Sequence, residues 1–597
     1  MKHYTQPLAL ALTLLLSVAT FNTHACTSFL ITRGASADGS TMITYAADAN
    51  VLYGELYFRP AATHPPGTML DLFSWHTGKP LGQIRQAERT YSVIGNMNEH
   101  QVAIGETTFG GRLELRDTTG IMDYGNLIYV TLQRAKTARQ AIRIIHELMS
   151  TYGYNMTGES FSIADPNEVW IMELIGKGIP ILDSRGNVDT RRWTRGAVWV
   201  AKRVPEGYIS GHANQARIMT FPVACGPRVR EPKSITCRNI ARLETTPSIE
   251  VVYSHDVVDY ARGIGIFNGT HEQFSFSDVY APLDFGAMRF CEARVWSGFR
   301  KANRSGIMDQ YEDYARGENP NNRMPLWIKP DRKLTLQDVF DMMRDHYQGT
   351  SLCMIQDNDP GAGPFKKPYR WRPMRWDLNG ERYVHERAIS TQQTGFSFIS
   401  QSRNWLPNPI GGILWFGVDD TYTTVWVPMY CAMNEVPHVF EVGNGHLLEY
   451  SPTSAFWLFN LVAHLAYLRY EDKIVDIKKV QRELEEGFMR RIAENDNAWR
   501  NITDHSRLVR ETTRFSLNQA QHTFDQWQRL KGYLMVKYLD GNVKREVEVN
   551  GRRQFLAEPY TVPGIPISPI QPRYPDWFYQ QIVDSFGKNI RYIEVKR

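Results

Sequence analysis

Alternating apolar and polar positions fill the first third of the chain and predict β-strands. Residues 26–32 (CTSFLIT) and 41–46 (TMITYA) are rich in β-branched and aromatic side chains. Asp38-Gly39 between them is a tight-turn signal, so the two segments predict a β-hairpin. Further strands are expected at 91–95, 102–108, 161–164, 169–174, 412–418 and 424–430.

Apolar residues at a spacing of three and four predict helices, most of them toward the carboxyl end. These helices are expected at 137–150, 452–468, 474–494 and 518–538. Mixed strands followed by long helices indicate packed sheets flanked by helices, an α+β fold. Because no clean linker stands out, residues 26–597 are expected to form one unit, helix-rich from about 452 to 597 and with a proline-rich extended segment at 563–575.

The composition favours a folded protein without a nucleic-acid partner. The 597 residues are 42% hydrophobic and 12% aromatic, whereas disordered chains lack such side chains. The 68 Lys and Arg residues against 63 Asp and Glu residues show no concentrated basic run. No metal-binding or nucleotide-binding spacing occurs, so no metal or cofactor is expected. His146-Glu147 has no second histidine nearby and is interpreted as part of an amphipathic surface helix.

The first 25 residues have the pattern of a secretory signal peptide. Lys2 and His3 make a basic start, residues 7–21 are mostly apolar, and Ala25 ends the segment. Cleavage is expected after Ala25, which predicts a secreted or periplasmic protein. The apolar run is shorter than the roughly 20 residues of a membrane span, so stable membrane insertion is not expected. Residues 455–468 are also too short and predict a buried helix.

Export would place the cysteines in an oxidising compartment. Cys225 and Cys237 are separated by a loop containing proline and arginine, and they predict a disulfide. Cys353 and Cys431 are a second candidate pair. The alternative is that all the cysteines are free thiols.

Cleavage after Ala25 would make Cys26 the first residue, and three interpretations are open. In the first interpretation Cys26 is a lipid attachment site, although Thr23 stands where lipoprotein signals usually have Leu. In the second it is a structural cysteine. In the third it is a nucleophile whose own α-amino group, with a pKa of about 7.7 to 8.0, accepts the thiol proton. In that third case removal of the signal peptide also activates the enzyme.

An ordered set of sequence motifs supports the third interpretation, in which Cys26 is a nucleophile. The motifs are Cys26-Thr27, Gly34-Ala35-Ser36, Asp38-Gly39-Ser40-Thr41-Met42, Asp48, and residues 98–101 (NEHQ), 105–108 (GETT), 212–217 (HANQAR), 284–286 (DFG), 289–294 (RFCEAR), 390–393 (STQQ) and 411–419. The set resembles the PepD-type dipeptidases, cysteine peptidase family sixty-nine, of the N-terminal-nucleophile (Ntn) hydrolases. It is more distantly similar to penicillin V acylase and bile salt hydrolase. The resemblance implies a four-layer αββα sandwich with helical insertions and a helical carboxyl-terminal segment.

The resemblance also implies catalytic roles. Cys26 attacks an amide carbonyl, Asp48 binds its α-amino group, and Asn214 donates to the oxyanion. The alternatives are a turn-capping carboxylate for Asp48 and a loop residue bonding its own backbone for Asn214. Many relatives have an arginine three residues before this aspartate, where the present chain has Tyr45. The tyrosine hydroxyl is a candidate donor near the thiol, and the cation could instead come from Arg217, Arg289 or Arg294.

A dipeptide substrate carries a charged amine and a charged carboxylate. Glu106 is expected to bind the amine, and an arginine, with Arg217 and Arg289 as candidates, to bind the carboxylate. Thr107 is a further candidate, unless it is an ordinary strand residue. The expected function is dipeptide hydrolysis through a thioester acyl-enzyme, without a cofactor. The alternatives are an amidase acting on N-acyl amino acids, penicillin V or conjugated bile acids, and a lipid-anchored binding protein without catalysis; the oligomeric state is not predicted.

Overall fold

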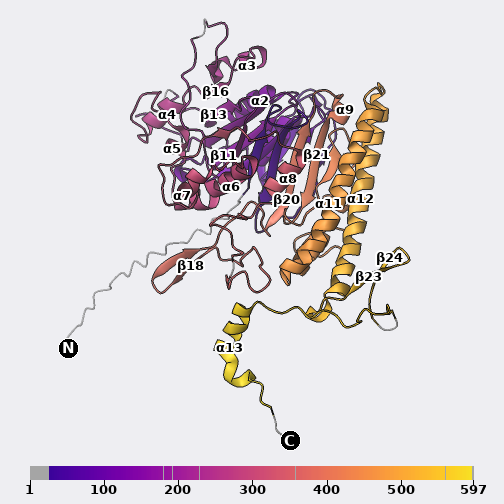
Figure 1. The fold of residues 1–597 in the computed structure, drawn as a ribbon. Helices are drawn as coiled ribbons and strands as arrows, with labels where there is room; N and C mark the ends of the chain where they lie inside the picture. Colours follow the sequence, from indigo (N-terminus) through magenta and orange to yellow (C-terminus); the bar gives the residue numbers. More distant parts are fainter. Residues whose placement is uncertain are drawn as a thin grey trace, which may run out of the picture.

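The computed structural model describes residues 26–178, 180–190, 193–226, 229–356, 358–557 and 560–594, and the expected signal peptide lies outside these ranges. Two large sheets, of seven and nine strands, form the centre of the molecule (Figure 1). Together with the helices around them they make a mixed α/β structure, which confirms the α+β expectation.

The seven-stranded sheet carries the amino-terminal hairpin in its middle. β1 (Ser28–Ile31) and β2 (Thr41–Asp48) are antiparallel, as predicted. The Asp38 carboxylate secures the turn between them by accepting hydrogen bonds from the Ser36 and Ser40 hydroxyls. The sheet continues past β1 with β14 (Ile209–His212) and β17 (Trp327–Ile328), and past β2 with β20 (Thr394–Ser402), β21 (Gly412–Val418) and β22 (Val427–Tyr430).

The nine-stranded sheet contains most of the other predicted strands. Its order is β15 (Ser234–Thr236), β16 (Val251–Tyr253), β13 (Ala197–Arg203), β12 (Val169–Gly176), β11 (Gly158–Ala164), β10 (Ala103–Phe109), β9 (Met97–Asn98), β8 (Val93–Ile94) and β3 (Phe58–Arg59). β15 and β16 are parallel, and the other pairs in this sheet are antiparallel.

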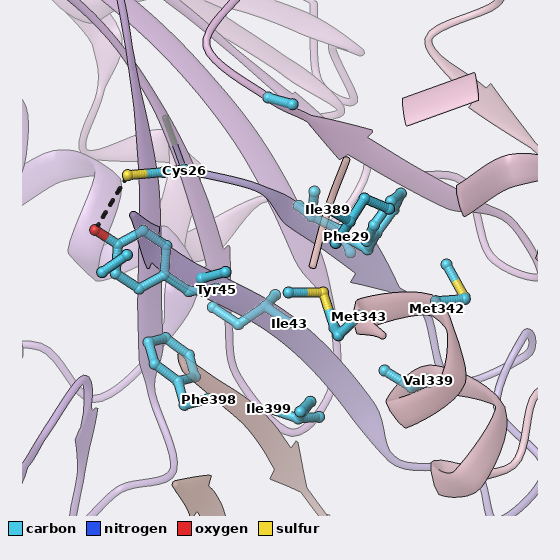
Figure 2. Close-up of a cluster of buried hydrophobic side chains, with 14 of the residues drawn as sticks. Cys26, Phe29, Ile43, Tyr45, Val339, Met342, Met343, Ile389, Phe398 and Ile399 are labelled. Atoms are coloured by element: carbon cyan, nitrogen blue, oxygen red, sulfur yellow. Dashed lines mark hydrogen bonds between the residues drawn. The ribbon is translucent and has the colours of Figure 1, made fainter. Parts of the chain in front are cut away.

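The two faces of the nine-stranded sheet pack into two different hydrophobic cores, because successive side chains of a strand point to opposite faces. On β11, Phe161 and Ile163 pack with α1 (Tyr124–Leu132) and α2 (Ala138–Tyr152) on one face. The opposite face packs against β1 and β2 of the first sheet. The outer face of the first sheet is covered by α8 (Leu336–Met343), whose Val339 and Met343 lie beside Ile43 and Ile399 (Figure 2). The sheets are therefore stacked between helices.

Three long helices follow the sheets, as the periodicity predicts. α11 (Tyr470–Trp499) and α12 (His505–Lys537) lie beside β21 in Figure 1 and contact β22. α10 (Ala455–Tyr467) packs against α12 and β21. Trp527 of α12 stacks on Phe459 of α10 at a centroid distance of 4.7 Å. In the described part of the chain, no helix has the length and apolar character that a membrane crossing requires.

The last helix, unlike the helices that cover the sheets, is not packed against the body of the protein. α13 (Asp576–Ile590) has no buried residue and stands apart from the sheets (Figure 1). Val583 and Phe586 on this helix are 51% and 59% exposed. It adds nothing to the two cores that position the site described below.

The predicted disulfide between Cys225 and Cys237 is wrong, because all six cysteines are free thiols in the structure. The Cys225 backbone N–H donates to the Ser234 carbonyl at 2.9 Å, which pairs it with the start of β15. Cys237 lies beyond the end of that strand, with its Sγ 3.3 Å from Nδ1 of His255. Cys353 and Cys431 are likewise unbonded, and the Cys431 thiol donates to the Asn408 carbonyl.

Candidate active site

Cys26 lies two residues before the start of β1 and is 4% exposed. Its Sγ is 3.6 Å from the Tyr45 hydroxyl on β2 (Figure 2) and 3.6 Å from Oε1 of Glu106 on β10. The Tyr45 hydroxyl donates to the same Glu106 oxygen. The two stacked sheets thus bring together three residues that the sequence singles out.

The surroundings of the thiol keep it protonated. Burial raises the Cys26 pKa well above its usual range, and the charges of Glu106 and Asp48 raise it further. The Asp48 backbone N–H and the Tyr45 hydroxyl oppose this shift by hydrogen bonding to the sulfur. Because the thiolate is the nucleophilic form, this cysteine needs a base or a nearby cation before it can react.

Asp48 ends β2 at a bulge opposite β20. One carboxylate oxygen accepts from Arg387 Nη2 at 3.0 Å, and the other accepts from the Thr394 hydroxyl at 2.7 Å. Burial raises the Asp48 pKa to about 6, against the opposing charge of Arg387. Asp48 is therefore a buried carboxyl group beside Cys26. Its partners are the Arg387 and Thr394 side chains rather than the backbone N–H groups that a turn-capping carboxylate would bind.

Arg294 supplies the cation nearest to the Cys26 backbone. It extends from α6 (Ala293–Ala302), and its Nη1 donates to the Cys26 carbonyl at 2.6 Å and to the Thr27 hydroxyl at 2.8 Å. Its Nη2 donates to the Asn214 side-chain oxygen at 2.9 Å. Of the three candidate arginines, Arg294 is the one that contacts the segment around Cys26.

Asn214 sits just past β14, which pairs with β1. Its backbone is left-handed, with φ 59°, a conformation that asparagine tolerates well. Its Nδ2 donates to the Thr108 carbonyl at 2.6 Å while its oxygen accepts from Arg294. Both ends of the amide are held, so its orientation is set before any substrate arrives.

A small cavity of about 30 Å³ opens on the Asp48 side of the site. Arg387, the partner of Asp48, lies in its wall. The other lining residues are Met354, Tyr369, Arg370, Arg372, Met374, Glu386, Ala388, Ser390, Thr391, Gln392 and Gln393. Of the three arginines in its wall, Arg387 pairs with Asp48 and Arg370 pairs with Asp359, so Arg372 is the candidate to bind an anionic ligand group.

Comparison with known proteins identifies the family. The family model described as peptidase family C69 matches residues 57–483, more than half of the chain. This chain belongs to peptidase family C69. A probable dipeptidase from Salmonella dublin is 24% identical over 428 residues, 68% of this chain and 81% of that protein. A probable dipeptidase from Latilactobacillus sakei is 22% identical over 505 residues, 80% of this chain and 89% of that protein.

The C69 match includes Glu106, Asn214, Arg294 and Arg387 but begins after Cys26 and Asp48. Another similar protein, dipeptidase A from Lactobacillus helveticus, is 21% identical over 488 residues, 78% of this chain and 84% of its own length. The enzyme class is therefore that of a peptidase, and the roles of Cys26 and Asp48 depend on the geometry above.

Three other predicted site residues of this C69 peptidase have partners elsewhere. Arg217 forms an ion pair with Glu292 at 3.0 Å, and both side chains are 2% exposed. Arg289 forms a two-pronged pair with Glu386. Thr107 shares a hydrogen bond of 2.7 Å with His212 between the sheets. The structure does not bring these three beside Cys26, and their contact with substrate stays a prediction.

The sequence analysis missed Arg387 and Glu159. Arg387 orients Asp48 from a loop more than three hundred residues away in the chain. Glu159 of β11 lies against Glu106 of β10. The 390–393 motif begins three residues after Arg387 and was a sequence signal for this segment. No pattern in the sequence indicated Glu159.

Proposed function

We propose that this C69 peptidase is an Ntn-type dipeptidase that uses Cys26 as its nucleophile once the preceding 25 residues have been removed. The observation that carries this proposal is the placement of the Cys26 thiol among Tyr45, Glu106 and Asp48 at the start of β1. The stacking of two sheets between helices supports assignment to the αββα Ntn sandwich. The similarity to dipeptidases supports the choice of dipeptides as substrates.

The first step requires a base for the thiol. Removal of the leader after Ala25 frees the α-amino group of Cys26, which then accepts the thiol proton as the sulfur attacks the substrate carbonyl. Asp48, held by Arg387 and Thr394, is placed to bind the resulting ammonium group. Arg294 holds the Cys26 carbonyl, so the nucleophile cannot swing away from the attack direction.

The tetrahedral intermediate and its products follow from the same groups. The second N–H of the Asn214 amide donates to the oxyanion, in an orientation fixed by Thr108 and Arg294. The Cys26 ammonium returns the proton to the leaving amine, and a thioester remains. Water then hydrolyses the thioester, with the α-amino group again acting as the base. The arginine-lined cavity beside Asp48 binds the carboxylate of the departing residue.

The decisive experiment compares cysteine variants of the leader-cleaved protein. Cys26→Ala is expected to lower dipeptide hydrolysis by at least about a thousandfold, because no other group replaces the nucleophile. Cys225→Ser is the matched control, since this half-buried thiol lies outside the site, and it should retain wild-type kcat/KM. Full activity in Cys26→Ala would exclude the mechanism.

The amino terminus of the exported protein tests the processing step. Intact mass and amino-terminal sequence should show a chain beginning at unmodified Cys26. A lipid mass on Cys26 would instead support an anchored binding protein. Faster turnover of an N-acyl amino acid than of any dipeptide would support the amidase alternative.

A further inference from the structure

A cluster of buried acidic and phenolic side chains adjoins the thiol on the nine-stranded sheet. Glu106 and Glu159 are 1% and 0% exposed. They share one face of the sheet because Glu159 pairs in register with Thr108, two residues along β10 from Glu106. Tyr154, which is fully buried after the end of α2, interacts electrostatically with both glutamates. The cluster is continuous with the site through the contact between Glu106 and Cys26.

Three oxygens in this cluster have no hydrogen-bond partner among the described residues. They are Glu106 Oε2, Glu159 Oε1 and the Tyr154 hydroxyl. The other Glu159 oxygen accepts from the Thr108 hydroxyl at 3.0 Å. Within the described ranges neither glutamate forms an ion pair with Arg, Lys or His. Buried polar atoms left in this way cost free energy, which points to a missing donor group.

In the absence of such a donor, Glu159 holds its proton more strongly than an ordinary carboxyl group. Burial, and after it the charge of Glu106, raise the pKa of Glu159 well above its usual range. Glu106 has no Arg, Lys or His ion-pair partner among the described residues, although its charge opposes ionisation of a thiol that must become a thiolate.

We propose that Glu106 and Glu159 form the subsite for the free α-ammonium group of the residue whose carbonyl Cys26 attacks. The inference rests on the proposed function. In that residue the α-nitrogen lies about 2.5 Å from the carbonyl carbon. The attacking sulfur must come within about 3 to 3.5 Å of the same carbon. The ammonium group therefore lies within about 6 Å of the Cys26 Sγ. Glu106 Oε1 lies 3.6 Å from the same sulfur, so it is within reach of this group.

An ammonium group matches the unpartnered oxygens in charge and in number of donors. Its three N–H bonds can reach two carboxyl oxygens and one hydroxyl. It takes the place of the proton on the Glu159 carboxyl group, and that proton leaves to solvent. Its positive charge also offsets the repulsion that Glu106 exerts on a Cys26 thiolate, so a substrate with a free amine assists its own attack. An N-acyl substrate offers only an uncharged amide at this position.

The test compares alanyl-alanine with N-acetyl-alanyl-alanine on the leader-cleaved protein. Wild type should favour the free amine by more than a hundredfold in kcat/KM. Glu159→Gln keeps the side-chain shape and should lower this preference by about tenfold to a hundredfold, mainly by raising KM for alanyl-alanine. Where the acetylated peptide is not turned over, its inhibition constant replaces kcat/KM. Tyr154→Phe removes one oxygen only and should lower the preference severalfold.

Asp165→Asn is the matched control, because this buried carboxyl group follows the opposite end of β11 and caps α2. It should leave the preference unchanged. Equal losses on both peptides in Glu159→Gln would overturn the inference, because they would mean that the pair serves the Cys26 amine or the fold. An unchanged preference in both Glu159→Gln and Tyr154→Phe would also overturn it. Either result leaves the proposed function intact if Cys26→Ala is inactive, whereas an active Cys26→Ala removes the proposed function itself.

Discussion

At the scale of single residues, the site depends on polar side chains buried where the two sheets meet. The Tyr45 hydroxyl contacts both the thiol and Glu106. Arg294 donates to the Cys26 backbone carbonyl. The cation therefore contacts the main chain of Cys26, whereas the tyrosine hydroxyl contacts its sulfur.

His212 shows the free-energy cost of such burial. It bridges the Thr107 and Ser162 hydroxyls, each at 2.7 Å, and is 0% exposed. Burial, with a smaller contribution from the Arg217 charge, lowers its pKa to about 3. The unfolded chain therefore binds a proton here near pH 6.5 that the folded chain binds only near pH 3. Stability linked to His212 is present above pH 6.5 and is lost as the pH falls toward 3.

This linkage predicts the pH dependence of unfolding. Between pH 7 and pH 4.5, His212 should lower the free energy of unfolding by about 2.5 kcal/mol. His212→Gln should show a pH dependence smaller by this amount in urea denaturation followed at both pH values. His522→Gln, an exposed histidine on α12, is the control and should keep the wild-type dependence. A His212→Gln curve parallel to that of wild type would contradict the linkage.

At the scale of elements, the contact between α6 and β1 positions the nucleophile. Gly298 of α6 lies against Phe29 of β1, and a Cβ at position 298 would stand 2.1 Å from the Phe29 ring. The same helix carries Arg294, which holds the Cys26 carbonyl. Close packing at Gly298 therefore sets the distance between Arg294 and the start of β1.

Gly298→Ala should accordingly lower both stability and activity. Forcing α6 away from β1 is expected to cost about 1 to 3 kcal/mol of unfolding free energy and to reduce kcat more than KM. Gly532→Ala on α12 is the matched control, because nothing lies within 4 Å of the added Cβ. It should raise stability by up to about 1 kcal/mol through helix propensity. Thermal unfolding and dipeptide kinetics of the two variants check the prediction, and similar behaviour of both would contradict it.

Elements with regular periodicity are predictable from the sequence, and contacts between distant segments are not. The β1–β2 hairpin, β21 and α10 follow from alternation, apolar runs and helical spacing. α12 begins at His505 rather than at 518, because buried Thr512, Thr513 and Ser516 face the core where an apolar pattern would be expected. Glu106 is predictable from its motif, whereas its contact with Glu159 arises only when β10 and β11 pair.

At the scale of the whole molecule, the last helix is separate from the catalytic body. The family match ends at residue 483, and α13 has no buried residue. By contrast, α10 and α12 are joined through the stacked Phe459 and Trp527. The long helices are therefore part of the folded body, while α13 is an addition to it.

A chain ending after residue 575 tests this division. It should keep wild-type kcat/KM and change Tm by less than about 2 °C, since α13 contributes no buried surface to the core. Trp527→Ala is the contrasting variant and should cost about 3 to 5 kcal/mol, because it removes a fully buried ring. Loss of activity in the shortened chain would show that α13 takes part in catalysis.

The raised pKa of the Cys26 thiol has a consequence for the lifetime of the enzyme. Oxidation to sulfenic acid and exchange into mixed disulfides both proceed through the thiolate. A thiol that burial and neighbouring carboxylates keep protonated is slow to enter either reaction. If the protein is exported as proposed, the resting enzyme resists the oxidants around it, and its sulfur becomes vulnerable chiefly while a substrate is bound. Damage by oxidants should then accumulate with the number of turnovers rather than with time.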